Sequence, residues 1–315
     1  MLHVRLIAPP ESTSEVLRLL DGSHAVTHLC VNPNAARKPS GDVVSFDVAR
    51  ESATDVIEAL RDLGLEHTGA IVVERLDITL SESASKAERE APGEPADAVV
   101  WEQLEQNAGE ETHLSATYLA FMVVATMIAG IGVILDQPIL IVGAMVVGPE
   151  FGPLVAFCVG LVTRRRHHAV QALGTVALGF AVGMAAAVVF TWVLTAFGLL
   201  DESMFRSERP LTSFIWQPDA LSWIVGFLAG IAGMLSLTSA KSGALVGVLI
   251  SVTTIPAAAN AAVALAYWVP REAVGSAIQL VINLSAIVVA GTLTLLVLRA
   301  RTERLAQRSA AASTA

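Results

Sequence analysis

The stretch Gly143-Ala-Met-Val-Val-Gly148-Pro149-Glu150-Phe151-Gly152-Pro153 places two prolines and one carboxylate inside an otherwise apolar segment. Each proline removes a backbone N–H donor and obstructs the carbonyl group four residues earlier, so a helix has to break there. In hydrocarbon, freed backbone groups are tolerated only where protein or water supplies new partners. The stretch therefore predicts a broken helix that faces other protein segments inside a membrane.

Apolar segments long enough to cross a bilayer recur on both sides of this stretch. Hydrophobic residues make up 54% of the 315 residues and charged residues only 16%, which is unusual for a soluble protein. A span needs about 20 apolar residues. The sequence predicts six spans, at roughly 114–135, 138–163, 169–200, 220–240, 242–268 and 274–298. They lie in a membrane domain at 113–300, after a soluble domain at 1–80 and an acidic connector with a juxtamembrane helix at 81–112, and before a tail at 301–315.

The charges of the connecting loops predict how the spans are oriented. With the N-terminus inside, the inner loops and the tail carry Arg164, Arg165, Arg166, Lys241, Arg299, Arg301, Arg304 and Arg308. The outer loops then carry only Arg206, Arg209 and Arg271. This distribution obeys the positive-inside rule, and no signal peptide is visible at the N-terminus. We expect a multi-pass protein of a bacterial or archaeal inner membrane with both termini in the cytoplasm.

The membrane half contains a candidate internal repeat. At an offset of 100, eight of 27 positions from Ala120 to Val146 are identical, although small and apolar residues inflate such matches in any membrane segment. Two units of three spans each would have opposite orientations in the membrane, and inverted repeats of this kind recur in transporters. The second unit has its own helix breaker, in the run from Thr253 through Pro256 to Asn260.

Broken helices that face each other near the middle of the membrane are where transporters build substrate and ion sites. Glu150 is the strongest candidate residue, because a carboxylate in this position is costly and usually has a function or a partner. It could coordinate a cation or couple to protons, or be a protonated or water-exposed side chain without a role. Gln279 and Asn283 share a face of the last span and could complete the site or only join helices. The candidate substrate- or ion-binding residues are Pro149, Glu150, Gly152, Pro153, Thr253, Thr254, Pro256, Asn260, Gln279 and Asn283.

Residues 2–80 show a βαββαβ pattern, which is typical of a ferredoxin-like α+β fold. We expect strands at Leu2–Ala8, Ala25–Val31, Asp42–Val48 and Ala70–Leu80, and helices at Ser12–Leu20 and Ser52–Leu63. A Ser-x-x-Glu box is expected to cap the first helix, and Gly64 to end the second. Strand alternation predicts one covered face, made of Leu2, Val4, Leu6, Leu29, Val31, Val44, Phe46 and Val48.

The other face of the predicted sheet is polar. His24, His28 and Cys30 lie there together with other polar residues, and these side chains could bind a soft or borderline metal ion. No compact ligand motif such as Cys-x-x-Cys is present. A ligand-sensing or dimerising face explains the same pattern, and the sequence names no cofactor.

The motif around the two prolines resembles a widespread prokaryotic family. The run from Met127 through Gly132, Asp136 and Pro138 to the AMVVGPEFGP segment resembles the uncharacterised hydrophobic-domain family of membrane proteins, a domain of unknown function. The SGALVG segment that starts at Ser242, followed by Pro256, and the Asn283-Leu pair are also similar to it. The resemblance covers about residues 115–300. Glu150 departs from the Leu that is more usual at its position in the family, and the family implies a fold but no activity.

Two functional classes remain open at this stage. The first is a transporter or channel-like protein for a small solute or ion, regulated by the cytoplasmic domain. The second is a membrane-anchored sensor or scaffold that transports nothing. We expect no enzyme, because no Ser/His, His-Glu-x-x-His or paired intramembrane aspartate arrangement is visible. We also expect a homo-oligomer, with the lipid bilayer and a small solute or ion as partners and no nucleic acid.

Overall fold

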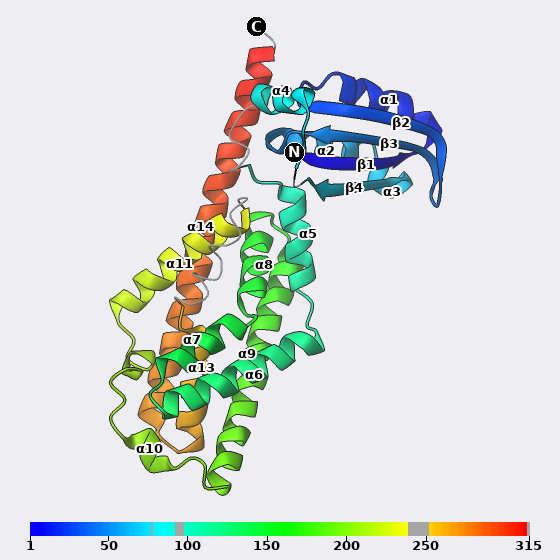
Figure 1. The fold of residues 1–315 in the computed structure, drawn as a ribbon. Coiled ribbons are helices and arrows are strands. Elements are labelled where there is room, and N and C mark those ends of the chain that lie inside the picture. Colours follow the sequence, from blue (N-terminus) through cyan, green and yellow to red (C-terminus); the bar gives the residue numbers. More distant parts are fainter. Residues whose placement is uncertain (77, 92–97, 239–251, 314–315) are drawn as a thin grey trace. The chain divides into compact units, whose positions relative to one another are not determined.

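The computed structural model describes residues 1–76, 78–91, 98–238 and 252–313 of the chain. The chain divides into two compact units. The first is built mainly from Met1–Gln103, and the second mainly from Leu104–Leu237 together with the described residues up to Val297. Figure 1 shows strands only in the first unit and long helices in the second. The second unit is the membrane part, so the two need separate accounts.

The first unit is a four-stranded antiparallel sheet with helices packed on it (Figure 1). Its strands lie in the order β2-β3-β1-β4. They are β1 (Leu2–Ala8), β2 (Val26–Arg37), β3 (Ser40–Val48) and β4 (Ala70–Arg75). The helical elements are α1 (Pro10–Asp21), which joins β1 to β2, and η1 (Arg50–Ser52), α2 (Ala53–Asp62) and α3 (Leu65–Thr68), which join β3 to β4. The element order along the chain is therefore βαββαβ.

The predicted covered face of this sheet is confirmed. Leu2, Val4, Leu6, Val44, Phe46 and Val48 are all buried, and they share one apolar core with residues of α1 and α2. Leu29 and Val31 are partly buried against the same core. Strand alternation with a period of two thus identified the inner face correctly.

Several element ends differ from the prediction. The helix α1 begins at Pro10 and has no side-chain cap, so the predicted capping box at Ser12 is wrong. The physical reason is that the N-cap residue is Pro9, whose side chain has no hydrogen-bond acceptor, while the fixed φ of Pro10 suits the first helical position. β2 extends beyond Val31 to Arg37, and β4 ends at Arg75 rather than Leu80. Gly64 has a φ of 75°, as expected for a glycine that ends a helix.

The acidic connector contains two helices, α4 (Glu82–Glu90) and α5 (Trp101–Glu111). Ser81 caps α4 by accepting a hydrogen bond from the backbone N–H of Ala84. Ala84 and Ala87 are buried, and the N-terminal ammonium group of Met1 contacts Glu88 at 3.0 Å. The part of the connector that forms α4 is therefore attached to the first unit, although its composition predicted a solvated segment.

Four helices of the second unit are long and apolar enough to cross a membrane, within the residues described. They are α6 (Ala116–Ile134), α9 (Arg166–Ala196), α11 (Ala220–Thr238) and α14 (Pro270–Ser313). A fifth span is possible if α7 (Pro138–Val147) and α8 (Phe151–Val162), bent by 51°, form one span together. The chain is therefore a multi-pass membrane protein, and α13 (Thr254–Ala266) is a shorter apolar helix within it.

The six predicted spans are found only in part. The second span, 138–163, is two helices with a sharp break between them, because Pro149 interrupts it. The fifth, 242–268, lies partly outside the described residues, which resume at 252 with α13. The last helix does not stop near 298 but continues to Ser313, into the predicted tail.

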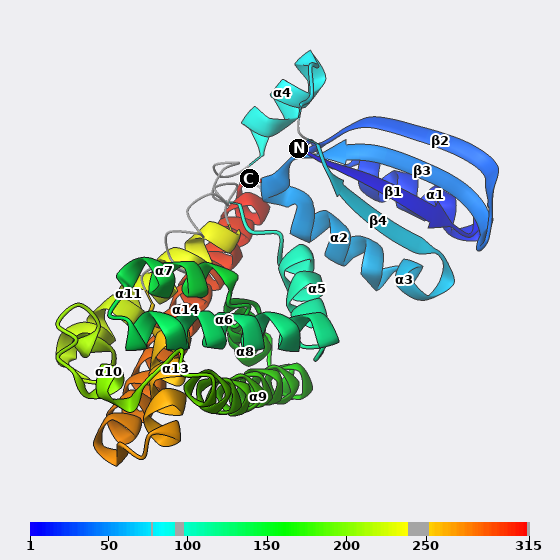
Figure 2. The same ribbon diagram turned by 60° about the horizontal axis from the view of Figure 1, so that its bottom comes forward.

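Two small elements, α10 (Glu202–Arg206) and η2 (Ser213–Ile215), lie between α9 and α11. The helix α6 packs against α7, α9 and α13 (Figure 2). Small residues allow close approach, since a Cβ on Gly183 would lie 3.1 Å from the Thr126 side chain. The Thr126 hydroxyl donates a hydrogen bond to the Gly183 carbonyl at 3.0 Å. This arrangement holds the broken pair α7–α8 and the short helix α13 in place.

Candidate functional site

The break in the α7–α8 pair is built by residues whose backbone suits it. α7 ends at Val147, and Pro149 follows its C-cap residue, Gly148. α8 begins at Phe151, with Glu150 as its N-cap residue. Pro153 is the third residue of α8, where an N–H group has no partner within the helix in any case. Both prolines therefore fit the break without leaving an unsatisfied helical carbonyl of their own.

The short helix α13 starts in the same manner. Thr253 is its N-cap residue and Pro256 its third residue. Pro153 of α8 and Pro256 of α13 therefore hold equivalent positions, each in the first turn of a short helix. The sequence matched the two breaker segments as a whole, and by position in the helix the counterpart of Pro256 is Pro153 rather than Pro149.

The two helix starts meet at Glu150. The Thr254 hydroxyl donates a hydrogen bond of 2.6 Å to Oε1 of Glu150. Gly148 also packs closely on this contact, because a Cβ at its position would lie 2.7 Å from Cγ1 of Ile255. The N-terminal end of a helix carries a partial positive charge that favours a carboxylate. Glu150 therefore lies where the N-termini of two short helices converge.

Glu150 is almost completely enclosed, with 6% of its surface exposed. Its second carboxylate oxygen, Oε2, has no hydrogen-bond partner among the residues described. A buried polar atom without a partner costs about 1 to 3 kcal/mol, and more if it is charged. Oε2 is therefore the one atom of this carboxylate that remains free to take a proton or a small cation.

Polar residues of the last span, in α14, lie against α13. The Asn283 side-chain amide donates to the Thr253 hydroxyl at 2.9 Å, and the Asn260 amide donates to Ser276 at 2.7 Å. Gln279 lies between Ser276 and Asn283 and is 1% exposed. Its Oε1 has no partner within the described part of the chain. Polar side chains thus continue from Glu150 along the contact between α13 and α14.

Arg209 belongs to this polar network, and the sequence did not identify it. It is 6% exposed, and its guanidinium group donates to Oδ1 of Asn260 at 3.2 Å and to Glu272 at the start of α14. The same group lies 4.1 Å from the centre of the Phe205 ring. Its position in a predicted loop indicated a solvated charge. The signal in the sequence that could have found it was Glu272 near the start of the last span, an acidic residue able to pair with a buried arginine.

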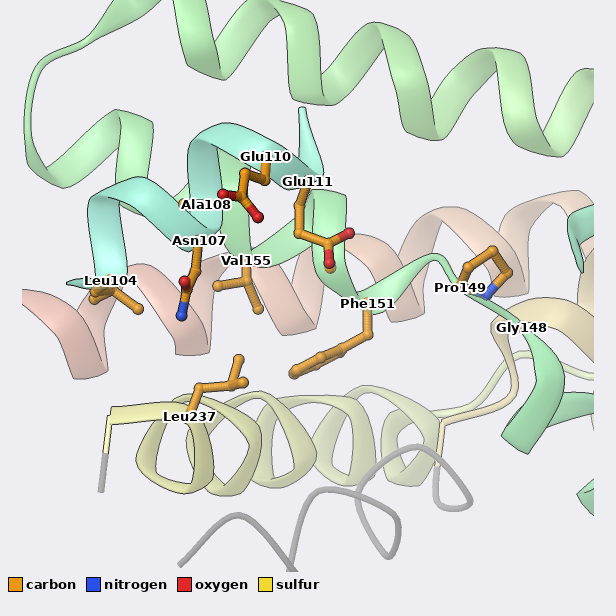
Figure 3. Close-up of a pocket in the computed structure, with 11 residues that line it drawn as sticks. Leu104, Asn107, Ala108, Glu110, Glu111, Gly148, Pro149, Phe151, Val155 and Leu237 are labelled. Carbon is orange, nitrogen blue, oxygen red and sulfur yellow. The ribbon is translucent and has the colours of Figure 1, made fainter. Parts of the chain in front are cut away.

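A pocket of about 530 Å³ lies beside the break, and Gly148, Pro149 and Gly152 form part of its lining. Its remaining lining residues come from α5, α8 and α11, and they are Leu104, Asn107, Ala108, Glu110, Glu111, Phe151, Val155 and Leu237 (Figure 3). The Glu111 carboxylate lies close against Gly152, since a Cβ at this glycine would lie 2.3 Å from one of its oxygens. The break at Pro149 therefore has a buried carboxylate behind it and an open pocket beside it.

The proposed metal ligands are not gathered into a site. His24 and Cys30 are exposed, and the His28 ring bonds to Asp47 at 2.7 Å and to Ser81 at 2.8 Å. His3 contacts the other oxygen of Asp47 at 2.6 Å. No group of three or more His, Cys, Asp or Glu side chains within the described ranges could hold a metal ion. Metal binding at His24, His28 and Cys30 stays a prediction without structural support.

Comparison with known proteins extends the account. An uncharacterized protein of Methanocaldococcus jannaschii, MJ0678, is 23% identical over 258 residues, which cover 79% of this chain and 75% of that protein. No solved structure matches the chain. Both short helices that meet at Glu150 lie inside the region matched by a family model. Residues 145–289 match the family described as Domain of unknown function (DUF389), which confirms the family resemblance.

Proposed function

We propose that this protein is a transporter or channel-like protein for a small solute or ion. The observation that carries the proposal is the buried carboxylate of Glu150, which lies where the break of the α7–α8 pair meets the start of the short helix α13. Discontinuous helices of this kind form the binding sites of many secondary transporters, and ionisable residues in the membrane mark ion or proton pathways. Glu150 is the residue that we assign to the transported or coupling ion.

The chemistry of the site favours reversible loading of Glu150. The Thr254 hydroxyl and two helix N-termini stabilise its ionised form, while the free Oε2 can accept a proton or a small cation. Loading that oxygen removes the attraction between the carboxylate and the two helix ends. A change in loading therefore changes how strongly α8 and α13 are held together, which is the coupling that alternating access requires.

The spacing of the helices supports a 3+3 inverted repeat. The helices begin at 116 and 220, at 151 and 254, and at 166 and 270, so the offsets are 104, 103 and 104. α6 and α11 both have 19 residues, and α8 and α13 have 12 and 13. Two units of three spans give the six predicted crossings. In this proposal the protein lies in the inner membrane of a bacterium or archaeon with both termini in the cytoplasm.

The compact unit built mainly from Met1–Gln103 is, in this proposal, a ferredoxin-like domain that regulates transport. Its βαββαβ order and its antiparallel strand order β2-β3-β1-β4 support that fold. The proposed partners are the bilayer, the small solute or ion and further copies of the same chain. Neither an enzymatic activity nor a nucleic-acid partner is part of the proposal.

A flux assay tests the proposal directly. The purified full-length protein is reconstituted into liposomes, and uptake is measured for a broad panel of small solutes and ions. We expect saturable uptake of at least one of them, which Glu150→Leu abolishes and Pro149→Ala reduces. Glu202→Leu is the control, because Glu202 is an exposed carboxylate that pairs with the exposed Arg206. Absence of flux from the unsubstituted protein across the panel would count against transport.

A sensor or scaffold without transport is the second candidate function. The observation that favours it is the Asp47 carboxylate, which both His3 and His28 contact on the polar face of the sheet. Such a cluster can respond to a bound ligand or a second copy. Thermal-shift screening of the full-length protein distinguishes the two candidates. A ligand that stabilises the protein, loses its effect in His28→Gln and is accompanied by no flux would favour sensing.

A further inference from the structure

The pocket beside the Pro149 break combines apolar walls with two carboxylates. Leu104 and Ala108 of α5 face Phe151 and Val155 of α8, and Leu237 of α11 closes a further side. Figure 3 shows the carboxylates of Glu110 and Glu111 next to each other on the α5 side, with Phe151 and Leu237 across from them. Asn107 adds an amide to the same rim. A ligand in this space would meet negative charge at one end and hydrocarbon at the other.

The two carboxylates have no positive partner among the residues that the structure describes. None of the lining residues is Lys, Arg or His, and neither carboxylate forms an ion pair or a hydrogen bond with a described residue. Partial burial, and then the neighbouring charge of Glu110, raise the pKa of the Glu111 carboxyl above its ordinary value. Both effects disfavour two negative charges in this place. A cation between the carboxylates would relieve that cost.

The size and lining of the pocket exclude a bare metal ion as the best fit. The volume of about 530 Å³ lies in the range of pockets that hold small organic molecules. Metal ions prefer three or more closely placed ligands, and the described residues offer no such group. The apolar walls, including the ring of Phe151, gain free energy only when hydrocarbon covers them.

We propose that this pocket binds an organic ammonium ion with an apolar body, whose charged end lies between Glu110 and Glu111. The pocket also touches the coupling residue, since Gly148 lines it and a Cβ on Gly148 would lie 2.5 Å from the free Oε2 of Glu150. Only a glycine therefore separates the ligand from the buried carboxylate. Transport of this cation rests on the function proposed above, whereas its binding does not.

Calorimetric titration of the full-length protein tests the binding. The protein is placed in nanodiscs of phosphatidylcholine, and phenethylamine is the probe at neutral pH. We expect phenethylamine to bind at least about tenfold more tightly than neutral phenylethanol or anionic phenylacetate, since a charge-assisted hydrogen bond contributes at least this much. Equal binding of the three probes would overturn the proposal.

Substitutions locate the binding in the pocket. We expect Glu111→Gln to weaken phenethylamine binding about tenfold or more. Asn107→Trp should abolish binding by filling the space, because Asn107 is exposed and tolerates a larger side chain. Glu105→Gln removes the same charge from the same helix outside the pocket, where Glu105 pairs with Arg165, and should leave binding unchanged. Unchanged binding in both pocket variants would overturn the assignment.

Further arms of the experiment identify the source of the ammonium group and separate the two proposals. If nanodiscs that contain phosphatidylethanolamine weaken the binding of phenethylamine, the lipid headgroup occupies the pocket; if they leave it unchanged, a free amine does. Amine binding without flux of any solute would overturn transport and leave the pocket assignment standing. Flux of another solute without amine binding would overturn the pocket assignment and leave transport standing.

Discussion

At the residue scale, the buried carboxylate of Glu150 is held by one hydrogen-bond donor among the described residues. The Thr254 hydroxyl is the hydrogen-bond partner of its Oε1 among the described residues, and the other oxygen has none there. The sequence singled out Glu150 because a carboxylate between two prolines is rare in an apolar segment. Its partner could not be deduced, since a contact between residues 104 positions apart depends on the packing of α8 on α13.

Removal of the Thr254 hydroxyl should destabilise the membrane unit. In Thr254→Val the Oε1 of Glu150 also loses its donor, so that neither carboxylate oxygen has one, and we expect a loss of about 1 to 3 kcal/mol in the free energy of unfolding. Thr254→Ser keeps the hydroxyl and should cost much less. The measurement is SDS-induced unfolding in mixed micelles. Equal losses in the two variants would show that the hydrogen bond does not matter.

The ion pair between Arg209 and Glu272 predicts a larger loss in the free energy of unfolding. Arg209→Met leaves Glu272 and Asn260 without their buried partner, so we expect a loss of about 3 kcal/mol in the same unfolding assay. Arg206→Met is the matched control, because Arg206 forms an exposed ion pair with Glu202 and should contribute less than about 1 kcal/mol. Similar losses in both variants would contradict the burial of Arg209.

Asp42 gives the first unit a pH dependence. The backbone N–H of Asn34 and the Thr13 hydroxyl hold the pKa of Asp42 below its usual range. A lowered pKa in the folded state contributes stability above the unfolded pKa, which is 3.8 for a free Asp, and this stability is lost as the pH falls through the folded-state pKa. Hydrogen exchange in β3 should accelerate below about pH 4, relative to intrinsic rates, and less so in Asp42→Asn. The same acceleration in both proteins would refute this assignment.

At the element scale, the starts of α8 and α13 carry the site. The sequence predicted the break at Pro149, because proline allows few alternatives, and α13 starts within the predicted breaker run Thr253–Asn260. It did not predict which prolines correspond, since Pro149 lies in the break while Pro153 and Pro256 lie in first turns. The capping box at Ser12 failed for a related reason, because Pro10 starts that helix without a cap.

Close packing of α11 on α14 depends on a missing side chain. A Cβ on Gly230 would lie 2.9 Å from the carbonyl oxygen of Ile287 and 2.8 Å from Cβ of Ala290. Gly230→Ala must therefore separate the two helices, and we expect a loss of about 1 to 3 kcal/mol in SDS unfolding. Gly143→Ala in α7 has no atom within 4 Å of the new Cβ and should be neutral or slightly stabilising. The opposite ranking would contradict the packing of these helices.

At the scale of the whole molecule, the chain joins a membrane unit to a small α+β unit. The composition shift near Leu114 was enough to predict that division, and strand alternation identified the buried face of the sheet. The network around Arg209 and the pocket between α5, α8 and α11 were not predictable, because both depend on how distant helices pack. The proposed function depends on that packing, since the contact between Thr254 and Glu150 joins the starts of α13 and α8.

Proton or cation movement in one matched pair of proteoliposomes tests this central claim most directly. Liposomes that contain the unsubstituted protein or Glu150→Gln are loaded with a pH-sensitive dye, and a membrane potential is imposed in the presence of the solute that the flux panel identifies. Glu150→Gln keeps the size of the side chain and removes its charge. The account predicts saturable movement in the unsubstituted protein and its loss in Glu150→Gln. Equal movement in both would contradict it.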